Sequence, residues 1–224
     1  MGGDLAPGST LPSASIMAQE YKLSRPALRE AIKLLAGKGL VSAAPRRGTI
    51  IRPRSEWNRL DFDLLAWEAE EAPTPNFIRD LFELRRMVEP EAAALAALRA
   101  TKAGISEIDA ALQAMTEADP NSEESLTADL NFHRSILIHS GNDFLAIFAP
   151  VIAASLRFAL VIQRKTPVSR EFFVPRHRTL FEAIKENRVA DARDAAQALL
   201  DLGEERALDV LKQDQVGSSR TSTE

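Results

Sequence analysis

The amino-acid sequence predicts a mainly α-helical protein that opens with two short helices and a small β-hairpin and continues as an all-α helical bundle. Three observations support this. Apolar residues recur at helical spacing through most of the chain after residue 74. Residues 40–52 instead contain two short β-like runs around a turn. The first 54 residues carry nine Lys/Arg against three Asp/Glu, a net charge of +6, whereas the remainder carries 19 against 29, a net charge of −10.

Composition excludes several classes of protein. The chain has 224 residues, 45% hydrophobic and 27% charged, which is typical of one large or two small globular domains. The absence of cysteine excludes disulfide scaffolds, thiol catalysis and cysteine-ligated metals. No apolar run reaches the roughly 20 residues that a membrane span needs, and the N-terminus has no apolar stretch typical of a secretory signal. We therefore expect a cytoplasmic protein without membrane contact.

The first domain is expected to comprise residues 1–54. Ser13 is placed to cap a short helix, and Ser24 to cap a second one after a tight connection. The β-like runs at 40–44 and 49–52 flank a basic turn and predict a hairpin. Helix, tight turn, helix and hairpin is the order of a winged helix-turn-helix.

The remaining chain is divided into a linker over 55–73, an all-helical domain over 74–214 and a disordered tail over 215–224, which is rich in Ser and Thr. Breaks between helices are predicted at Gly104, Pro120, Gly141 and Pro167. The predicted helices span about 75–100, 105–118, 123–140, 143–165, 169–187 and 190–212.

A basic cluster in the first domain predicts binding to double-stranded DNA. Arg25 and Arg29 are four residues apart at the start of the second helix, where a recognition helix contacts bases and phosphates in the major groove. The free N–H groups of that turn can hold a phosphate. The hairpin tip would follow the DNA backbone or reach the minor groove, and the alternative is a solvated basic face. The predicted DNA-binding residues are Ser24, Arg25, Pro26, Arg29, Arg46, Arg47, Gly48 and Thr49.

These motifs resemble the DNA-binding domain of GntR-family transcriptional regulators. The residues that carry the resemblance are Pro7-Gly8-Ser9, Leu11-Pro12, Leu23-Ser24-Arg25-Pro26, Leu28-Arg29-Glu30-Ala31, Leu35, Gly39-Leu40-Val41 and Arg47-Gly48. The helical remainder resembles the FCD effector domain of the FadR-type branch. Residues 57–67 are similar to the linker of galactonate-operon regulators within that branch. The resemblance also implies a further helix before the Pro-Gly turn, which the first domain lacks as given.

A candidate metal site lies in the helical domain. Asp129 and His133 are four residues apart and share one helix face, which suits a divalent ion such as Zn, Ni or Mn. His177 continues an apolar stripe on another helix and is expected to point inward. From the residues alone, two core histidines and a capping aspartate remain the alternative.

The resemblance implies a divalent metal bound by Asp129, His133 and His177, with a fourth ligand near residues 201–203. No histidine follows His177. Three possibilities therefore stay open: three protein ligands completed by water or effector, replacement by Asp201, or loss of the metal.

The resemblance further implies that Arg85 points into an effector cavity, where a guanidinium can pair with a carboxylate. An intrahelical pair with Glu89 is the alternative. Asn142 and Arg157 match positions at the same cavity. The sequence is thus interpreted as a homodimeric, ligand-controlled transcriptional regulator, a repressor released from operator DNA by a sugar acid such as galactonate. The alternatives are a metal-dependent hydrolytic enzyme and a ligand-binding module that no longer binds DNA.

Overall fold

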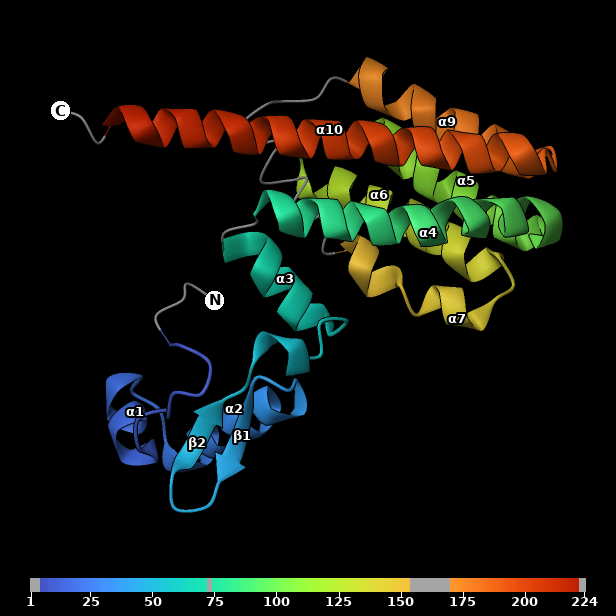
Figure 1. Ribbon diagram of the computed structural model, residues 1–224. Coiled ribbons are helices and arrows are strands. Elements are labelled where there is room, and N and C mark those ends of the chain that lie inside the picture. The colour runs from blue at the N-terminus through green and yellow to red at the C-terminus, as the bar shows by residue number, and fades with distance from the viewer. Residues whose placement is uncertain (1–4, 72–73, 154–169, 222–224) are drawn as a thin grey trace. The chain divides into compact units, whose positions relative to one another are not determined.

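The computed structural model of the protein describes residues 5–71, 74–153 and 170–221 (Figure 1). The chain divides into two compact units, Met1–Glu71 and Ala72–Glu224. The first contains the small antiparallel sheet, and the described part of the second is helical. The predicted fold class, a winged helix-turn-helix followed by an all-α bundle, is confirmed. No helix among the described residues is long and apolar enough to cross a membrane.

The N-terminal unit begins with helix α1 (Ala14–Glu20) and helix α2 (Arg25–Gly37). The Ser13 hydroxyl accepts a hydrogen bond from the Ile16 N–H, and the Ser24 hydroxyl accepts one from the Ala27 N–H. Each serine therefore satisfies an N–H group that has no partner within its helix, as predicted. Lys22 makes the tight connection between the two helices with a positive φ of 53°.

The wing consists of strands β1 (Val41–Ala44) and β2 (Gly48–Ile51), paired antiparallel with Val41 opposite Ile51. The segment before α1 adds to this sheet. The Leu11 N–H donates to the Thr49 carbonyl at 2.8 Å, and Thr10 forms a β-bridge with Ile50. The wing is thereby attached to the rest of its unit along the outer edge of β2.

After the wing follow a 3₁₀ turn η1 (Arg54–Glu56) and helix α3 (Phe62–Glu71). Both lie within the range 55–73 that the sequence assigns to a linker, apart from the first residue of η1. Leu64, Leu65 and Ala66 of α3 are buried. This segment is thus a folded part of the N-terminal unit.

The helical unit contains α4 (Pro75–Arg99), α5 (Lys102–Glu117), α6 (Glu123–His139), α7 (Asp143–Ala146), α9 (Arg170–Lys185) and α10 (Val189–Thr221). Helices α4 and α10 run side by side across the unit (Figure 1). Small buried residues on both helices, among them Ala92, Ala96, Ala192 and Ala196, allow close packing. The core beneath them includes Phe132, Ile136 and Leu180.

The helix boundaries differ from the prediction in informative places. Gly104 does not break a helix but lies in the first turn of α5, which starts at Lys102 because Thr101 caps it. The predicted continuous helix over 143–165 is wrong in its described part: α7 ends at Ala146, a turn covers residues 147–148, and helical backbone resumes at 149–153. Residues 154–165 and Pro167 lie outside the described residues. Helical backbone continues to Thr221, beyond residue 215, where a disordered tail was expected.

Candidate nucleic-acid interface and metal centre

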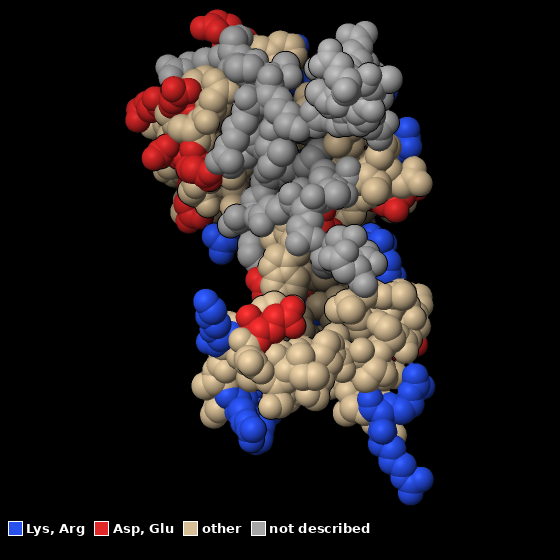
Figure 2. All heavy atoms as spheres, turned by 90° about the vertical axis from the view of Figure 1, so that its left-hand side faces the viewer, with Lys and Arg blue, Asp and Glu red and all other residues tan. Residues whose placement is uncertain are grey.

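The N-terminal turn of α2 is exposed and basic. Pro26 lies in the first turn, where its missing N–H is not needed, and Ser24 caps the helix. Arg25 and Arg29 are both solvent-exposed, and Leu28 between them is buried, so the helix is anchored by one face and presents the other. Figure 2 shows Lys and Arg side chains projecting from the N-terminal unit, whereas Asp and Glu are prominent on the helical unit.

The tip of the wing is also exposed and basic. Arg46 has a φ of 61° and Gly48 a φ of 84°, so the turn needs two residues in the left-handed region. A Cβ at Gly48 would meet only the Thr10 side chain at 3.8 Å, so backbone conformation, and not crowding within the chain, accounts for glycine here. Arg46 and Arg47 project into solvent, and Thr49 is half-buried.

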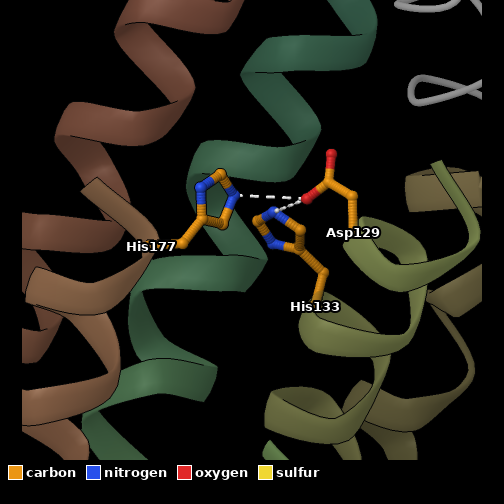
Figure 3. Close-up of side chains that lie close together, drawn as sticks. All are labelled: Asp129, His133 and His177. Atoms are coloured by element: carbon orange, nitrogen blue, oxygen red, sulfur yellow. Dashed lines mark ion pairs between the residues drawn. The ribbon is translucent and has the colours of Figure 1, made fainter. Parts of the chain in front are cut away.

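In the helical unit, three ligand-type side chains converge from two helices (Figure 3). Asp129 and His133 are one turn apart on α6, and His177 reaches them from α9. The Asp129 Oδ1 atom lies 3.4 Å from His133 Nε2 and 3.2 Å from His177 Nε2. All three side chains are buried, as the apolar stripe on its helix predicted for His177.

The neighbours of these histidines fix which nitrogen faces the cluster. Glu89 Oε2 lies 2.7 Å from His133 Nδ1, and the Phe173 carbonyl lies 3.1 Å from His177 Nδ1. Each acceptor is matched by a proton on Nδ1, so in the neutral imidazole the lone pair is on Nε2 and points to Asp129. Carboxylates and carbonyls hold metal-binding histidines in this way. The sequence did not predict that Glu89 orients His133. The one available signal was its spacing of four from Arg85, which puts both residues on the same face of α4.

The fit to a cation rests on Asp129 Oδ1. This buried oxygen has no hydrogen bond among the described residues, because neither nearby imidazole meets hydrogen-bond geometry. A buried carboxylate oxygen that accepts no hydrogen bond is costly, and a divalent ion facing both Nε2 atoms would satisfy it. The donor set of one oxygen and two nitrogens suits Zn, Ni or Mn.

The charged groups of the cluster shift one another's pKa values. Burial alone would raise the pKa of the Asp129 carboxyl, but the two imidazoles outweigh it and hold that pKa well below its ordinary range. Burial would lower the pKa of His133, but the Glu89 and Asp129 carboxylates raise it. A metal on His133 Nε2 would take the place of the proton that the imidazolium carries there.

The effector-binding residues that the resemblance implies, Arg85 and Asn142, differ in burial and in hydrogen-bond partners. Arg85 is buried, and its Nε donates to Glu89 at 2.5 Å, so the intrahelical pair is present. Asn142 caps α7 through a bond from the Phe144 N–H. Arg157 lies outside the described residues. Asp201, the alternative fourth ligand, is exposed and paired with Arg86, so it does not join the cluster.

A small cavity adjoins His133 on the Glu89 side. Its lining is mostly apolar, so Glu89 and His133 supply its polar groups within the described part of the chain. The lining residues are Glu89, Ala92, Ala93, His133, Ile136, Leu137, Leu180 and Ala196.

Comparisons with known proteins agree with both units. The family of bacterial regulatory proteins named gntR matches residues 1–51, and the FCD domain matches residues 80–202. The galactonate operon transcriptional repressor of Escherichia coli (strain K12) is 31% identical over 202 residues, covering 88% of this chain and 87% of that protein. The HTH-type transcriptional regulator LutR of Bacillus subtilis (strain 168) is 28% identical over 208 residues, covering 88% and 91%.

Solved structures share the fold. Lar, which controls expression of the agr system in Listeria monocytogenes, matches with a TM-score of 0.67 at 18% identity, covering 92% of this chain and 90% of that one. Streptococcus agalactiae GntR matches with a TM-score of 0.52 at 24% identity, covering 90% and 92%.

A winged helix-turn-helix unit joined to a helical effector unit defines a transcription factor with separate DNA-binding and ligand-binding parts. The chain belongs to the GntR family of bacterial regulatory proteins and contains an FCD domain. It is therefore a transcriptional regulator and not an enzyme. The family assignment sets aside the hydrolytic alternative.

Proposed function

We propose that the protein is a cytoplasmic, homodimeric repressor of an operon for sugar-acid or related organic-acid catabolism, released from its operator by a small carboxylate such as galactonate. The similarity to the galactonate operon transcriptional repressor supports this choice of effector class. An effector acts only through a difference in affinity between dimer arrangements. A small change in the spacing of two recognition helices is enough to lose register on half-sites about one helical turn apart.

In this proposal α2 enters the major groove. Arg25 and Arg29 read bases and phosphates, while Ser24, Pro26 and the free N–H groups of the first turn form a phosphate site. Arg46, Arg47, Gly48 and Thr49 of the wing follow the backbone or the minor groove. The exposure of the four arginines supports these roles.

The effector site is centred on a divalent metal held by Asp129, His133 and His177. The observation that carries this part is Asp129 Oδ1, which accepts no hydrogen bond among the described residues and faces two Nε2 atoms whose rings are fixed from the other side. Three protein ligands leave coordination positions for water or for a carboxylate. The metal would supply the positive charge that anchors an acidic effector.

Arg85 is proposed as a second anchor for the effector carboxylate, together with Asn142 and Arg157. Only the Nε of Arg85 donates to Glu89, and no described residue accepts from its two terminal nitrogens. These nitrogens can form a bidentate pair with a carboxylate. Arg85 would then connect effector, Glu89 and His133.

The test is fluorescence anisotropy with labelled DNA from upstream of the protein's own gene, at two salt concentrations and with added sugar acids. We expect specific binding that strengthens at low salt and is lost with one aldonate. Arg29→Ala should weaken this binding. Arg79→Ala, which removes an exposed arginine of α4, is the matched control and should not. Ligand binding without any salt-dependent DNA affinity would support instead a module that no longer binds DNA.

A further inference from the structure

Lys38, directly after recognition helix α2, has a buried side chain. It is only 8% exposed, although lysine is normally among the most exposed residues. Its Nζ donates to Asp61 Oδ1 at 2.6 Å and to Asp63 Oδ2 at 2.7 Å. One ammonium at the end of α2 is therefore bound by two carboxylates around the start of α3. We refer to Lys38, Asp61 and Asp63 as the Lys38 clamp.

The backbone closes the same contact. The Asn58 N–H donates to the Lys38 carbonyl at 2.9 Å. Gly39 has a φ of 76°, and a Cβ there would lie 2.6 Å from the Glu56 carbonyl oxygen, so only glycine allows η1 to approach this closely. The turn after α2 is thus pressed against the segment that leads into α3.

The clamp also shapes α3 itself. Asp61 Oδ1 accepts from the Leu64 N–H at 3.1 Å, so the carboxylate that binds Lys38 satisfies the first turn of α3 as well. The Lys38 ammonium lies 5.7 Å from the centre of the Trp67 ring, within cation–π range. The residue that directly follows α2 therefore holds the start of α3 through Asp61 and Asp63 and its second turn through Trp67.

From these contacts we infer that Lys38 is a positioning residue of the regulator: by fixing α3 to α2, it makes the recognition helix and the last helix of its unit one rigid body. The chain continues from α3 to the helical unit, so the covalent connection between the two units begins at α3. The inference rests on the proposed function, because it concerns the spacing of two recognition helices on two half-sites. A loosened clamp would leave each half-site contact intact and lose the fixed spacing.

Two duplexes separate these effects: an operator selected from a random pool by the wild-type protein, and the same duplex with one half-site scrambled. We expect Lys38→Gln to weaken binding to the full operator by at least about tenfold, because rigid coupling of two sites raises affinity strongly. Binding to the single half-site should stay within about twofold, because the Lys38 ammonium is buried against Asp61 and Asp63 and offers no exposed charge to a phosphate. Lys38→Arg should restore the full-operator affinity.

Lys33→Gln is the matched control, since Lys33 is an exposed lysine on α2 whose Nζ pairs only with Glu30 among the described residues. It should change binding to both duplexes by the same factor. An equal factor for Lys38→Gln would overturn the inference. Should Lys38→Gln fail to fold, Asp61→Asn takes its place and the same comparison decides.

A fluorescence measurement tests the clamp without DNA. The chain has two tryptophans, so Trp57→Phe leaves Trp67 as the only tryptophan, and excitation at its red edge follows it alone. In that background Lys38→Gln should raise acrylamide quenching of Trp67, and Lys33→Gln should not. Unchanged quenching would overturn the clamp. If the wild-type protein selected no operator from the random pool, the proposed function would fail, while this measurement would still decide whether α3 is held by Lys38.

Discussion

The two units carry their functional residues in opposite ways. In the N-terminal unit the candidate DNA-binding residues are nearly all exposed and come from two short stretches, the start of α2 and the tip of the wing. In the helical unit the candidate metal ligands are buried and come from α6 and α9, with Glu89 of α4 behind them. Substitutions of the exposed DNA-binding residues should therefore change DNA affinity without changing stability. Substitutions of the buried metal ligands should change both metal affinity and stability.

The largest effect is expected at the buried cluster. Asp129→Asn removes the charge that faces both imidazoles and should weaken binding of Zn, Ni or Mn by at least about 100-fold. Isothermal titration calorimetry of chelator-treated, dialysed protein measures this. Asp109→Asn, on the exposed face of α5, is the control and should bind like the wild type. Equal affinities of the Asp129 variant and the wild type would remove the metal from the proposal.

The surface of α2 should show the opposite behaviour. Arg29→Ala should weaken operator binding by about 1–3 kcal/mol, and if Arg29 contacts a phosphate the salt slope should fall by about one. Because Arg29 is exposed, the melting temperature should not change. Anisotropy titrations and thermal unfolding on the same samples test both parts. A drop in melting temperature that accounts for the affinity loss would contradict the separation of function from stability.

Alanine substitutions at one glycine in each unit test how tightly each unit is packed there. A Cβ at Gly104 would lie 2.7 Å from the His139 ring, which also pairs with Glu107 at 2.8 Å. Gly104→Ala should therefore destabilise the helical unit by about 1–2 kcal/mol. Gly37→Ala has nothing within 4 Å of its new Cβ and should stabilise α2 by about 0.4–1 kcal/mol. Thermal unfolding followed by circular dichroism distinguishes them, and two shifts of the same sign would contradict this view of the packing.

The smallest effect concerns pH. Burial would raise the pKa of Asp61, but the bond from Lys38, the charge of Lys38 and the backbone N–H groups of Leu64 and Asp63 together outweigh it and lower that pKa. Bonds to Asp61 and Asp63 raise the pKa of Lys38. The Asp61 contribution is therefore present above its unfolded pKa of about 3.9 and lost as pH falls below it. The Lys38 contribution is present below about pH 10.4 and lost above it.

We accordingly expect the stability of the N-terminal unit to fall below about pH 4 and above about pH 10, by less than about 1 kcal/mol from this pair because Asp61 and Asp63 are partly exposed. Tryptophan emission follows this unit, since Trp57 and Trp67 both lie in it. In Lys38→Gln the acid-side loss should shrink. If the variant lost the same stability below about pH 4 as the wild type, Lys38 would not be the cause of that loss.

Much of the fold could be predicted because its signals are local. Ser24 with Pro26 marks the start of α2, and the wing follows from two β-like runs around a turn. The prediction of a helix break at Gly104 was wrong. A glycine that leaves space for a side chain distant in sequence, here the His139 ring, cannot be distinguished from one that ends a helix by the residues around it. The contact of the Thr10 segment with β2 joins residues 40 apart, and no periodicity indicates it.

The same distinction between local signals and contacts of distant residues applies to the candidate site. By itself the sequence determined the helical spacing that puts Asp129 and His133 on one face, the inward direction of His177 and the exposed position of Arg25 and Arg29, because each depends on helix geometry within a few residues. Only the tertiary structure decided that His177 meets Asp129, that Glu89 orients His133, and that Lys38 is buried between two aspartates. These contacts join separate helices, and packing of the whole unit sets their distances.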